Sequence, residues 1–469
     1  MAIQKKYDFI VLGGGSGGYA AARTGVASGL RVLVIDGGTE IGGLCILRGC
    51  MPSKTLIESA NRYRVMRECE EFGLGAEGIS FSGEAIIARK RRLIKEFADY
   101  RAEQLQDGRF DFVRGLGRFV GKNKIRVREE SGEEWDVEFA KCLVATGSET
   151  KLLGIPGLKE AKPWTSDDVL DSAYIPASII VLGGGAIALE LAHYYGALGV
   201  EVKVIQRSAQ VLRGTDKDMA EVVVDAFRAR GIEIFTDTEL QRVEIRDGKK
   251  VVHFLHEGVP CEVVGEEILE CLGRKPATGK LNLEALGVEA AKGGALETGL
   301  DQKVSGGEDI YAAGDVCGPY EIVHLAIEQG EIAARNAARE LGHLSGKMET
   351  MDYRLKMLGI FCEPQVASVG LGEEEAREEG RDIEVATHPF DDHGKSMVMG
   401  ELHGFVKLVV DRESREIIGG GVVGPHAVEL IHEVAVAMAF RATAGQFAKV
   451  PHYHPTLSEI WTYPAEDLA

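Results

Sequence analysis

Short apolar runs followed by glycines recur along the chain and predict the strands of an α/β protein. Residues 7–12 read as a buried strand, the glycine run 13–18 follows directly, and an alanine-rich helical stretch comes next. Residues 31–35 form the next predicted strand. The same order returns later, with strands at 178–182 and 201–205 around a second glycine run. The pattern therefore predicts two Rossmann-like domains with parallel sheets.

The last third of the chain has a different pattern. Strands are predicted at 404–411 and 417–423, and an apolar helix at 427–440. With 469 residues the chain is also too long for one hydrophobic core. We expect an α/β fold with two Rossmann-like dinucleotide-binding domains and a C-terminal α+β domain.

The first glycine run predicts a dinucleotide site. Gly13, Gly15 and Gly18 have the Gly-x-Gly-x-x-Gly spacing, which allows a tight turn and lets the backbone approach a pyrophosphate at a helix N-terminus. Asp36 ends the next strand, where it is placed to bond a ribose hydroxyl. A plain glycine-rich turn is the alternative.

The second run, Gly183, Gly185 and Ala188, predicts another dinucleotide site. Here Gln206 replaces the acid at the same phase, 23 positions after the first glycine (13 to 36 and 183 to 206). Arg207 and Arg213 follow in the sequence, and a positive charge at this position favours binding of the 2′-phosphate of NADPH. We therefore expect the second site to prefer NADPH over NADH; the alternative is that both arginines are solvated surface charges on an enzyme that uses NADH.

Charge and composition narrow the class of protein. The net charge is −19, and no run of five or more Lys/Arg offers a footprint for nucleic acid. No apolar stretch reaches about 18 residues, so we expect no membrane partner and a cytoplasmic protein. Of the eight cysteines only Cys45 and Cys50 are close in sequence, which favours a catalytic pair over a structural disulfide framework.

The spacing of this pair has a physical consequence. In an ideal helix, positions i and i+5 are about 8.6 Å apart, beyond the roughly 7 Å that a disulfide spans. A distorted first turn is needed, and the glycines nearby allow it, while Pro52 suits a helix start before a helical stretch at 55–63. Two lone thiols or half a zinc site are the alternatives, but no second Cys/His pair has ligand spacing, so we expect no metal.

The segment from Gly42 to Lys54, with Cys-x4-Cys before Pro-Ser-Lys, resembles the active-site motif of the dihydrolipoamide dehydrogenase and glutathione reductase family of flavin disulfide reductases. Motifs at 143–147 and 309–315 follow in the family's order. The resemblance implies FAD in the first site, held by Thr146, Gly147 and Asp315. It also implies an ion pair of Lys54 with Glu190 beside the flavin, although a plain surface pair is the alternative.

Near the C-terminus, His454 before Pro-Thr and Glu459 five residues on resemble the family's acid/base pair. Thr456 and Glu459 also have capping-box spacing, which would start a helix. We expect no catalytic role for His452. In the family the histidine at the position of His454 reaches the disulfide of the other subunit, so the resemblance implies a homodimer and a dimerisation domain.

The resemblance implies four segments: an FAD-binding domain at 1–150 with the redox disulfide, an NAD(P)-binding domain at 151–275, the second FAD segment at 276–347 and the dimerisation domain at 348–469. The function it implies is an FAD-dependent NAD(P)H:disulfide oxidoreductase. Electrons pass between nicotinamide, FAD, the Cys45–Cys50 disulfide and a small dithiol, disulfide or lipoyl-type substrate. Cys50 would be the flavin-side thiolate, stabilised near a helix N-terminus by Lys54, and Cys45 the exchange thiol.

The chain also departs from the family pattern. Leu47-Arg48 stands where relatives usually carry Asn-Val, and Leu44 replaces a usual Thr. Arg48 could favour an anionic disulfide or be an exposed arginine without a role. An NAD(P)H diaphorase or a pyridine nucleotide transhydrogenase is the main alternative function. A glutathione reductase-type enzyme, a mercuric reductase, whose C-terminal cysteine pair is absent here, and a non-enzymatic flavoprotein subunit rank lower.

Overall fold

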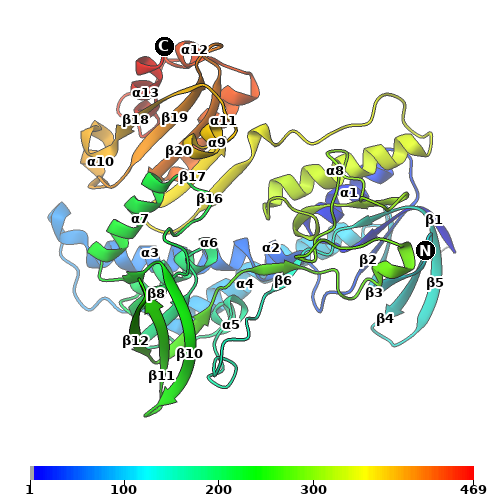
Figure 1. Cartoon of the computed structure of the whole chain (residues 1–469), viewed down its shortest axis with the longest axis horizontal. Coiled ribbons are helices and arrows are strands. Elements are labelled where there is room, and N and C mark those ends of the chain that lie inside the picture. Colours follow the sequence, from blue (N-terminus) through cyan, green and yellow to red (C-terminus); the bar gives the residue numbers. More distant parts are fainter. Residues whose placement is uncertain (1–4) are drawn as a thin grey trace. The chain divides into compact units, whose positions relative to one another are not determined.

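The computed structural model describes residues 5–469, which form two compact units (Figure 1). The first unit contains the chain up to Pro52, then Ala88–Lys151 and Gly273–Asp352. The second contains Ser53–Ile87, Leu152–Leu272 and Tyr353–Ala469. The four-segment domain division remains a prediction.

The first unit is built on a mixed sheet. Its parallel part has the order β3-β2-β1-β5-β15, and β4 joins β3 to β5 by antiparallel pairing. The buried strand β1 lies centrally, which explains its continuous apolar run. The strands are β1 (Lys6–Leu12), β2 (Val32–Asp36), β3 (Asp111–Gly121), β4 (Lys124–Glu129), β5 (Glu134–Val144) and β15 (Ile310–Ala312), with a small ribbon of β6 (Ser148–Thr150) and β14 (Arg274–Pro276).

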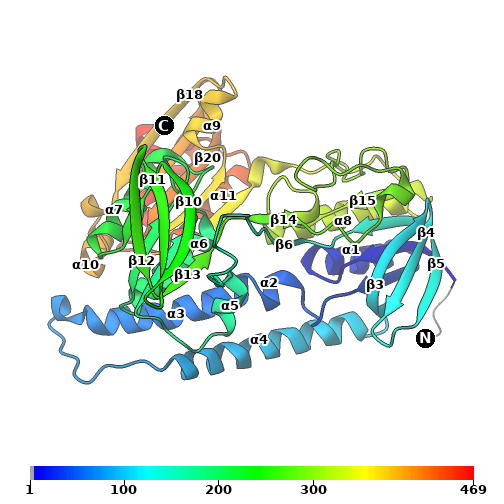
Figure 2. The same ribbon diagram turned by 60° about the horizontal axis from the view of Figure 1, so that its bottom comes forward.

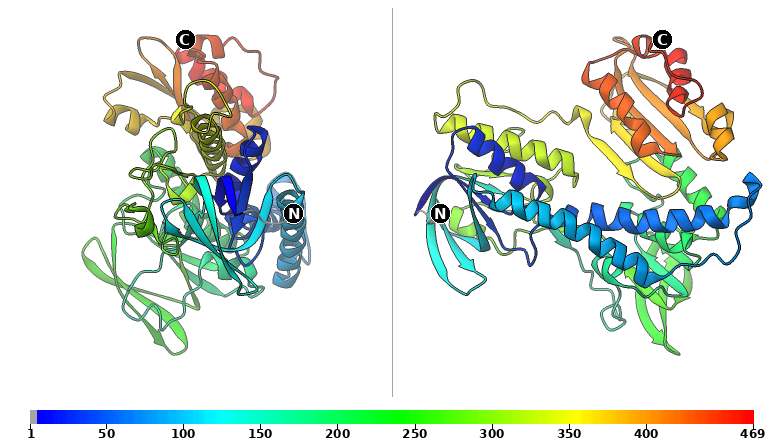
Figure 3. Two further views of the ribbon diagram at one scale, coloured as in Figure 1. Left: turned by 90° about the vertical axis from the view of Figure 1, so that its right-hand side faces the viewer. Right: turned by 180° about the vertical axis from the view of Figure 1, so that it is seen from behind.

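Two helices of this unit, α1 (Ser16–Ala27) and α8 (Val323–Glu340), lie side by side (Figure 3). Their approach depends on glycines. A Cβ on Gly17 would lie 2.7 Å from the Ala326 carbonyl oxygen, and one on Gly330 would lie 2.2 Å from the Gly17 oxygen. The backbones are therefore in contact, and larger side chains would push the helices apart.

Three further helices begin in the segment after β2. They are α2 (Gly43–Leu47), α3 (Cys50–Arg67) and α4 (Gly83–Gln106). The predicted helical stretch at 55–63 is therefore too short at both ends. Pro52 lies in the first turn of α3, where its missing N–H is tolerated.

The second unit contains the other Rossmann-like sheet, which is parallel with the order β13-β7-β8-β9. The two strands predicted here match the structure residue for residue. The elements are α5 (Ser166–Asp171), β7 (Ser178–Leu182), α6 (Ala186–Ala197), β8 (Glu201–Ile205), α7 (Lys217–Ala229), β9 (Glu233–Phe235) and β13 (Glu267–Glu270). Before β13, an antiparallel sheet is formed by β10 (Thr238–Arg246), β11 (Lys249–His256) and β12 (Val259–Gly265) (Figure 2).

The C-terminal part of the second unit is an antiparallel sheet of order β16-β17-β20-β19-β18, packed against α11. The strands are β16 (Met357–Ile360), β17 (Gln365–Gly370), β18 (Ile383–Pro389), β19 (Phe405–Asp411) and β20 (Ile417–Gly424). The helices are α9 (Glu373–Glu378), α10 (Gly394–Met399), α11 (Ala427–Ala439), α12 (Ala444–Phe447) and α13 (Thr462–Asp467). The predicted α+β character of this part is confirmed.

None of the helices within residues 5–469 combines the length and the apolar composition needed to cross a membrane.

Candidate active site

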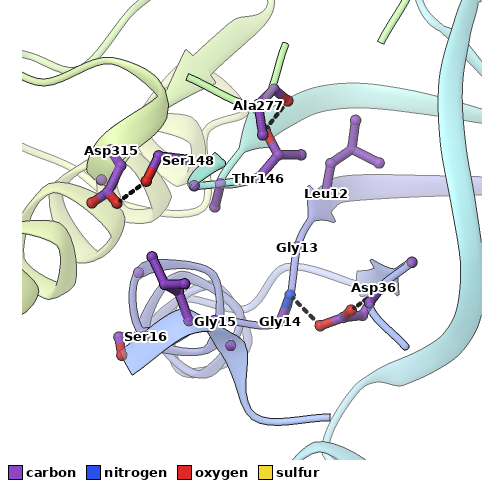
Figure 4. Close-up of a pocket in the computed structure, with 18 of the residues that line it drawn as sticks. Leu12, Gly13, Gly14, Gly15, Ser16, Asp36, Thr146, Ser148, Ala277 and Asp315 are labelled. Carbon is purple, nitrogen blue, oxygen red and sulfur yellow. Dashed lines mark hydrogen bonds between the residues drawn. The ribbon is translucent and has the colours of Figure 1, made fainter. Parts of the chain in front are cut away.

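The first glycine loop connects β1 to α1 and is held by Asp36 at the end of β2 (Figure 4). The Asp36 carboxylate is 7% exposed and accepts hydrogen bonds from the backbone amides of Gly14 at 2.9 Å and Gly38 at 2.8 Å. These bonds orient the carboxylate toward the loop, as the position of a ribose-binding acid requires.

Two of the three predicted glycines of this loop, Gly13 and Gly18, have no room for a side chain. Gly13 has φ of +106°, and its Cβ would lie 2.3 Å from the Ala145 oxygen. A Cβ on Gly18 would lie 1.9 Å from the Gly13 oxygen. A Cβ on Gly15 would lie no closer than 3.7 Å to any atom, so the loop is open on that side. Tight packing on one side and open space on the other suit a loop that holds a phosphate group.

A cavity of about 530 Å³ lies over this loop. The cavity is lined by Cys45 and Cys50, together with Asp36 and Asp315. The same cavity therefore contains the predicted nucleotide-binding groups and the predicted redox pair, all within the first unit.

The far side of the cavity is formed by residues from the end of β5 and from the segment after β15 (Figure 4). Thr146 Oγ1 donates to the Ala277 oxygen at 3.0 Å, and Gly147 has φ of +69°. Asp315 accepts a hydrogen bond of 2.6 Å from the Ser148 hydroxyl, and Arg274 Nε donates to that hydroxyl oxygen at 2.8 Å. Asp315 is thus held in a fixed orientation.

Ser148 and Glu321 also line the cavity, and neither is among the predicted site residues. Ser148 directly follows the recognised motif, so its position was a usable signal. Glu321 belongs to no motif, and no sequence feature indicates it. Partial desolvation in the cavity raises the pKa of the Glu321 carboxyl, and the negative charge of Asp315 adds to that effect. Glu321 is therefore more easily protonated than a glutamate with the ordinary pKa and is then a hydrogen-bond donor.

The two cysteines are positioned by a broken helix. Cys45 lies in α2, the chain turns at Arg48 and Gly49, and Cys50 is the first residue of α3. Gly42 and Gly43 have φ of +152° and +73°, so the entry to α2 requires glycine. The expected distortion is thus a complete break. Both cysteines are half-buried.

Arg48, between the cysteines, lies 3.7 Å from the Glu40 carboxylate, and both side chains are well exposed. Such a pair contributes little to stability.

The second glycine loop connects β7 to α6 in the same way as the first. Gly183 has φ of +114°, Gly185 has open space around it, and Ala188 takes the buried third position. Gln206 packs against the loop and donates to the Gln210 oxygen at 3.2 Å. Arg207 and Arg213 are exposed and form no ion pair within residues 5–469.

Lys54 and Glu190 form the predicted ion pair. Lys54 Nζ lies 2.7 Å from the Glu190 carboxylate, which is 4% exposed, and 4.7 Å from the centre of the Phe361 ring. The Phe361 amide donates to Glu190 at 3.0 Å. The lysine charge is therefore shared with a buried acid and an aromatic face. The position of this pair beside a flavin remains a prediction.

The predicted acid/base pair is also in contact. His454 Nδ1 lies 2.9 Å from Glu459 Oε1, and the histidine side chain is 76% exposed. The hydrogen bond from His454 holds the pKa of the Glu459 carboxyl below its usual value. The other histidine, His452, is buried against Glu433 at 2.5 Å. This contact is consistent with a structural role for His452.

The alternative capping box is only partly present. The short helical turn begins at Ser458 and has no side-chain cap. Glu459 instead accepts from the His454 ring and the Thr456 amide. Another buried ring, His393, interacts electrostatically with Glu459 and was missed, because a single histidine in a loop carries no sequence signal.

The residues of the first cavity fit FAD, and those of the second loop fit a nicotinamide nucleotide. Each of the two glycine loops stands at the start of a helix. One side of the loop is packed so closely that a Cβ does not fit, and the other side is open to a phosphate group. With a dithiol in the first cavity, the fold and the site define a flavin-dependent oxidoreductase with a thiol redox centre.

Comparison with known proteins agrees with this class of enzyme. The model of the pyridine nucleotide-disulphide oxidoreductases matches residues 7–330, and that of their dimerisation domain matches residues 358–465. The chain belongs to this family, whose members use FAD and NAD(H). The dihydrolipoyl dehydrogenase of Thermus scotoductus is 34% identical, covering 99% of this chain and 98% of that protein. One from Bacillus subtilis is 32% identical, with coverages of 97% and 96%.

Solved structures give the same result. LpdA from Mycobacterium tuberculosis superposes with a TM-score of 0.87 at 28% identity, covering 98% of this chain and all of that one. The Cu(II) complex of the HOCl-induced flavoprotein disulfide reductase RclA from Escherichia coli has a TM-score of 0.86 at 25% identity, with coverages of 99% and 100%. The chain is thus a flavin-dependent pyridine nucleotide-disulfide oxidoreductase similar to dihydrolipoyl dehydrogenases.

Proposed function

We propose that the enzyme exchanges electrons with a lipoyl-type dithiol or disulfide through Cys45 and Cys50, as a homodimer. The observation that carries this proposal is the shared cavity, in which both thiols lie beside the nucleotide-binding loop and Asp315. The dihydrolipoyl dehydrogenases at 34% and 32% identity support the substrate class, and the matched dimerisation domain supports the homodimer.

The nucleotide cofactors supply, when bound, the hydride and two-electron chemistry that side chains lack. The chain itself holds them. Gly13 and Gly18 pack the loop tightly and Gly15 leaves its open side for a pyrophosphate, while Asp36 offers its carboxylate to a ribose. Asp315 is oriented by Ser148 to accept hydroxyl hydrogens. In the second unit, the loop from Gly183 to Ala188 provides the corresponding cradle for the nicotinamide nucleotide.

The exchange at sulfur proceeds in two balanced steps in the reducing direction. The Cys45 thiolate attacks one sulfur of the substrate, which forms a mixed disulfide and breaks the substrate disulfide; the released sulfur takes a proton. The Cys50 thiolate then attacks the Cys45 sulfur, which releases the second substrate thiol and leaves a Cys45–Cys50 disulfide. Oxidation of a dihydrolipoyl group is the same sequence reversed.

His454 is the proton donor and acceptor in these steps. Its Nε2 is free to face a substrate sulfur because Nδ1 is engaged by Glu459. Glu459 fixes the orientation of the ring and compensates its charge when it is protonated. The high exposure of His454 suits a group that acts on the disulfide of the partner subunit.

The decisive test of this function is Cys45→Ser. We expect NADH- or NADPH-dependent reduction of lipoamide to fall on the order of 10³-fold, because the exchange nucleophile is removed. Reduction of an artificial dye needs no exchange thiol and should persist. Steady-state rates with lipoamide and with the dye, measured on the same preparation, give both values.

Cys69→Ser is the matched control, since Cys69 is also a partly buried thiol but donates to the Leu74 oxygen at 3.5 Å and is not among the residues that line the cavity. Its lipoamide rate should equal that of the wild type. If Cys45→Ser retained lipoamide reduction, the proposed disulfide chemistry would be wrong and a diaphorase or transhydrogenase function would replace it.

A further inference from the structure

Glu321 faces the cavity of the first unit from the segment between β15 and α8. Its side chain is exposed, and it lines the cavity together with Asp315 and with Val323 in the first turn of α8. Asp315 is held by the Ser148 hydroxyl, whereas Glu321 forms no hydrogen bond or ion pair within residues 5–469. Both carboxyl oxygens of Glu321 can therefore bind a molecule in the cavity.

The two sides of the cavity suit different halves of FAD. Asp36 and the first glycine loop fit the ribose and the pyrophosphate of the ADP half. Asp315 lies on the far side of the cavity from Asp36 (Figure 4). The flavin half must extend away from Asp36 to reach Cys45 and Cys50, which line the same cavity. Glu321 follows Asp315 on the far wall, so the flavin half is the part of FAD that it meets.

The surroundings of Glu321 make its ionised form costly. Partial desolvation raises the pKa of its carboxyl, the negative charge of Asp315 adds to this effect, and the positive charge of Arg274 opposes it. A flavin against the carboxyl would remove more water from it and raise the pKa further. A small additional negative charge nearby is then enough to make Glu321 bind a proton.

We propose that Glu321 contacts the flavin half of FAD and takes up a proton when the flavin is reduced. Glu321 thereby sets how the reduction potential of the flavin depends on pH. The inference deepens the proposed function and rests on it for the direction in which the flavin extends from the glycine loop.

The proton uptake accompanies the transfer of one hydride. The nicotinamide nucleotide gives up two electrons and one proton, and the reduced flavin carries more negative charge than the oxidised one. An O–H bond then forms on Glu321 with a proton from the solvent, and it breaks again when the flavin passes its electrons on. Because Glu321 binds its proton more tightly beside the reduced flavin, protonation of Glu321 favours reduction.

The test is the reduction potential of the flavin across a range of pH. The full-length, FAD-loaded chain carries Cys45→Ser and Cys50→Ser, so that the flavin exchanges no electrons with this pair. Anaerobic reduction against a reference dye, followed by absorbance, gives the ratio of reduced to oxidised flavin from about pH 5 to about pH 9, on both sides of the expected titration.

Glu321→Gln in this chain should give the parent ratio at the acid end, where neither side chain is charged. At the alkaline end it should raise the ratio about tenfold at the same ambient potential, because the ionised glutamate of the parent disfavours the reduced flavin. A tenfold change in the ratio is about 30 mV for a two-electron couple. Glu321→Asp keeps a carboxyl and should stay closer to the parent than Glu321→Gln does.

Glu328→Gln is the matched control. Glu328 is another glutamate of α8 whose pKa is raised by partial desolvation, but it is not among the residues that line the cavity. Its ratio should equal that of the parent at every pH. Every variant keeps the remaining charged groups of the cavity, which are Asp36, Glu40, Arg48, Glu149, Lys280 and Asp315.

Equal ratios in FAD-loaded Glu321→Gln and its parent at every pH would overturn the inference. So would a difference that is the same at every pH, because Glu321 would then act on the flavin without changing its own protonation. Glu321→Met, which also removes the charge, replaces Glu321→Gln if that chain does not retain FAD. Since both cysteines are replaced, a negative result here is separate from the lipoamide assay of Cys45→Ser, which tests the proposed function.

Discussion

Single carboxylates in this protein differ sharply in what surrounds them. Asp36 accepts hydrogen bonds from two backbone amides, those of Gly14 and Gly38. Glu459 is held by a histidine, and that hydrogen bond lowers its pKa. Glu363, between β16 and β17, has the opposite environment, since burial raises its pKa to about 7 despite the nearby Arg64 and Arg230. The local environment, not the residue type, decides which acid is ionised.

The raised pKa of Glu363 predicts a pH-dependent stability. Between pH 4.5 and pH 7 the folded state holds a proton that the unfolded state has lost, so wild-type stability falls as pH rises through this window. Glu363→Gln lacks this penalty. The free energy of unfolding of Glu363→Gln relative to wild type should therefore increase from pH 4.5 to pH 7, by roughly 3 kcal/mol, and then stay constant. Denaturant unfolding across this range measures it.

Glu378→Gln, at an exposed position of α9, is the control and should show no such trend. A difference between Glu363→Gln and wild type that is independent of pH would contradict the buried, protonated state of Glu363.

At the scale of elements, local sequence and packing contribute differently. The strands β7 and β8 and the glycine loops were predictable because apolar runs and glycine positions are local signals. The helix α3 is longer than the predicted stretch at 55–63. Its Leu56, Ile57 and Ala60, which join a core cluster with β7 and α6, all lie inside the predicted stretch, whereas the turns at 50–54 and 64–67 add no residue to that cluster.

The loop after β8 supports a prediction about the nucleotide. Arg207 and Arg213 are exposed, unpaired with any acid in residues 5–469, and follow Gln206 at the end of the strand. We propose that they bind a 2′-phosphate. Replacing both by Ala should lower kcat/KM for NADPH about 10- to 100-fold, because charge-assisted hydrogen bonds are lost, with little change for NADH.

Arg246→Ala, which removes an arginine bound to Glu244 and Glu262 on the β10–β12 sheet, is the control for general loss of charge. A wild-type enzyme that prefers NADH would show this proposal to be wrong.

At the scale of the whole molecule, the chain crosses between its two compact units several times. Segments far apart in sequence, such as β1 and β15, meet in one sheet, and the C-terminal part of the second unit is the dimerisation domain of the family. His454 is exposed in this domain. We propose that it completes the site of a second subunit.

A mixed dimer tests this directly. Cys45→Ser and His454→Gln homodimers should each lack lipoamide reduction. If His454 acts on the partner subunit, a heterodimer of the two variants combines one intact Cys45 with one intact His454 in the same site. The heterodimer, purified with two different tags, should then show about half of the wild-type rate per dimer.

Two wild-type chains with different tags, carried through the same purification, give the reference rate. A heterodimer as inactive as its parents would place both residues in one subunit's site, and a monomeric, fully active enzyme would disprove the dimer itself.

The sequence by itself determined the two nucleotide loops and the closeness of the two cysteines, because each depends on residues within one strand–loop–helix unit or a few positions apart. It also predicted that His454 works with Glu459 and that Lys54 pairs with Glu190, but only through the family resemblance. Only the tertiary structure showed Ser148 holding Asp315 and placed Glu321 on the wall of the same cavity. Ser148 and Asp315 are 167 positions apart, and no periodicity of the chain records which distant segments packing brings together.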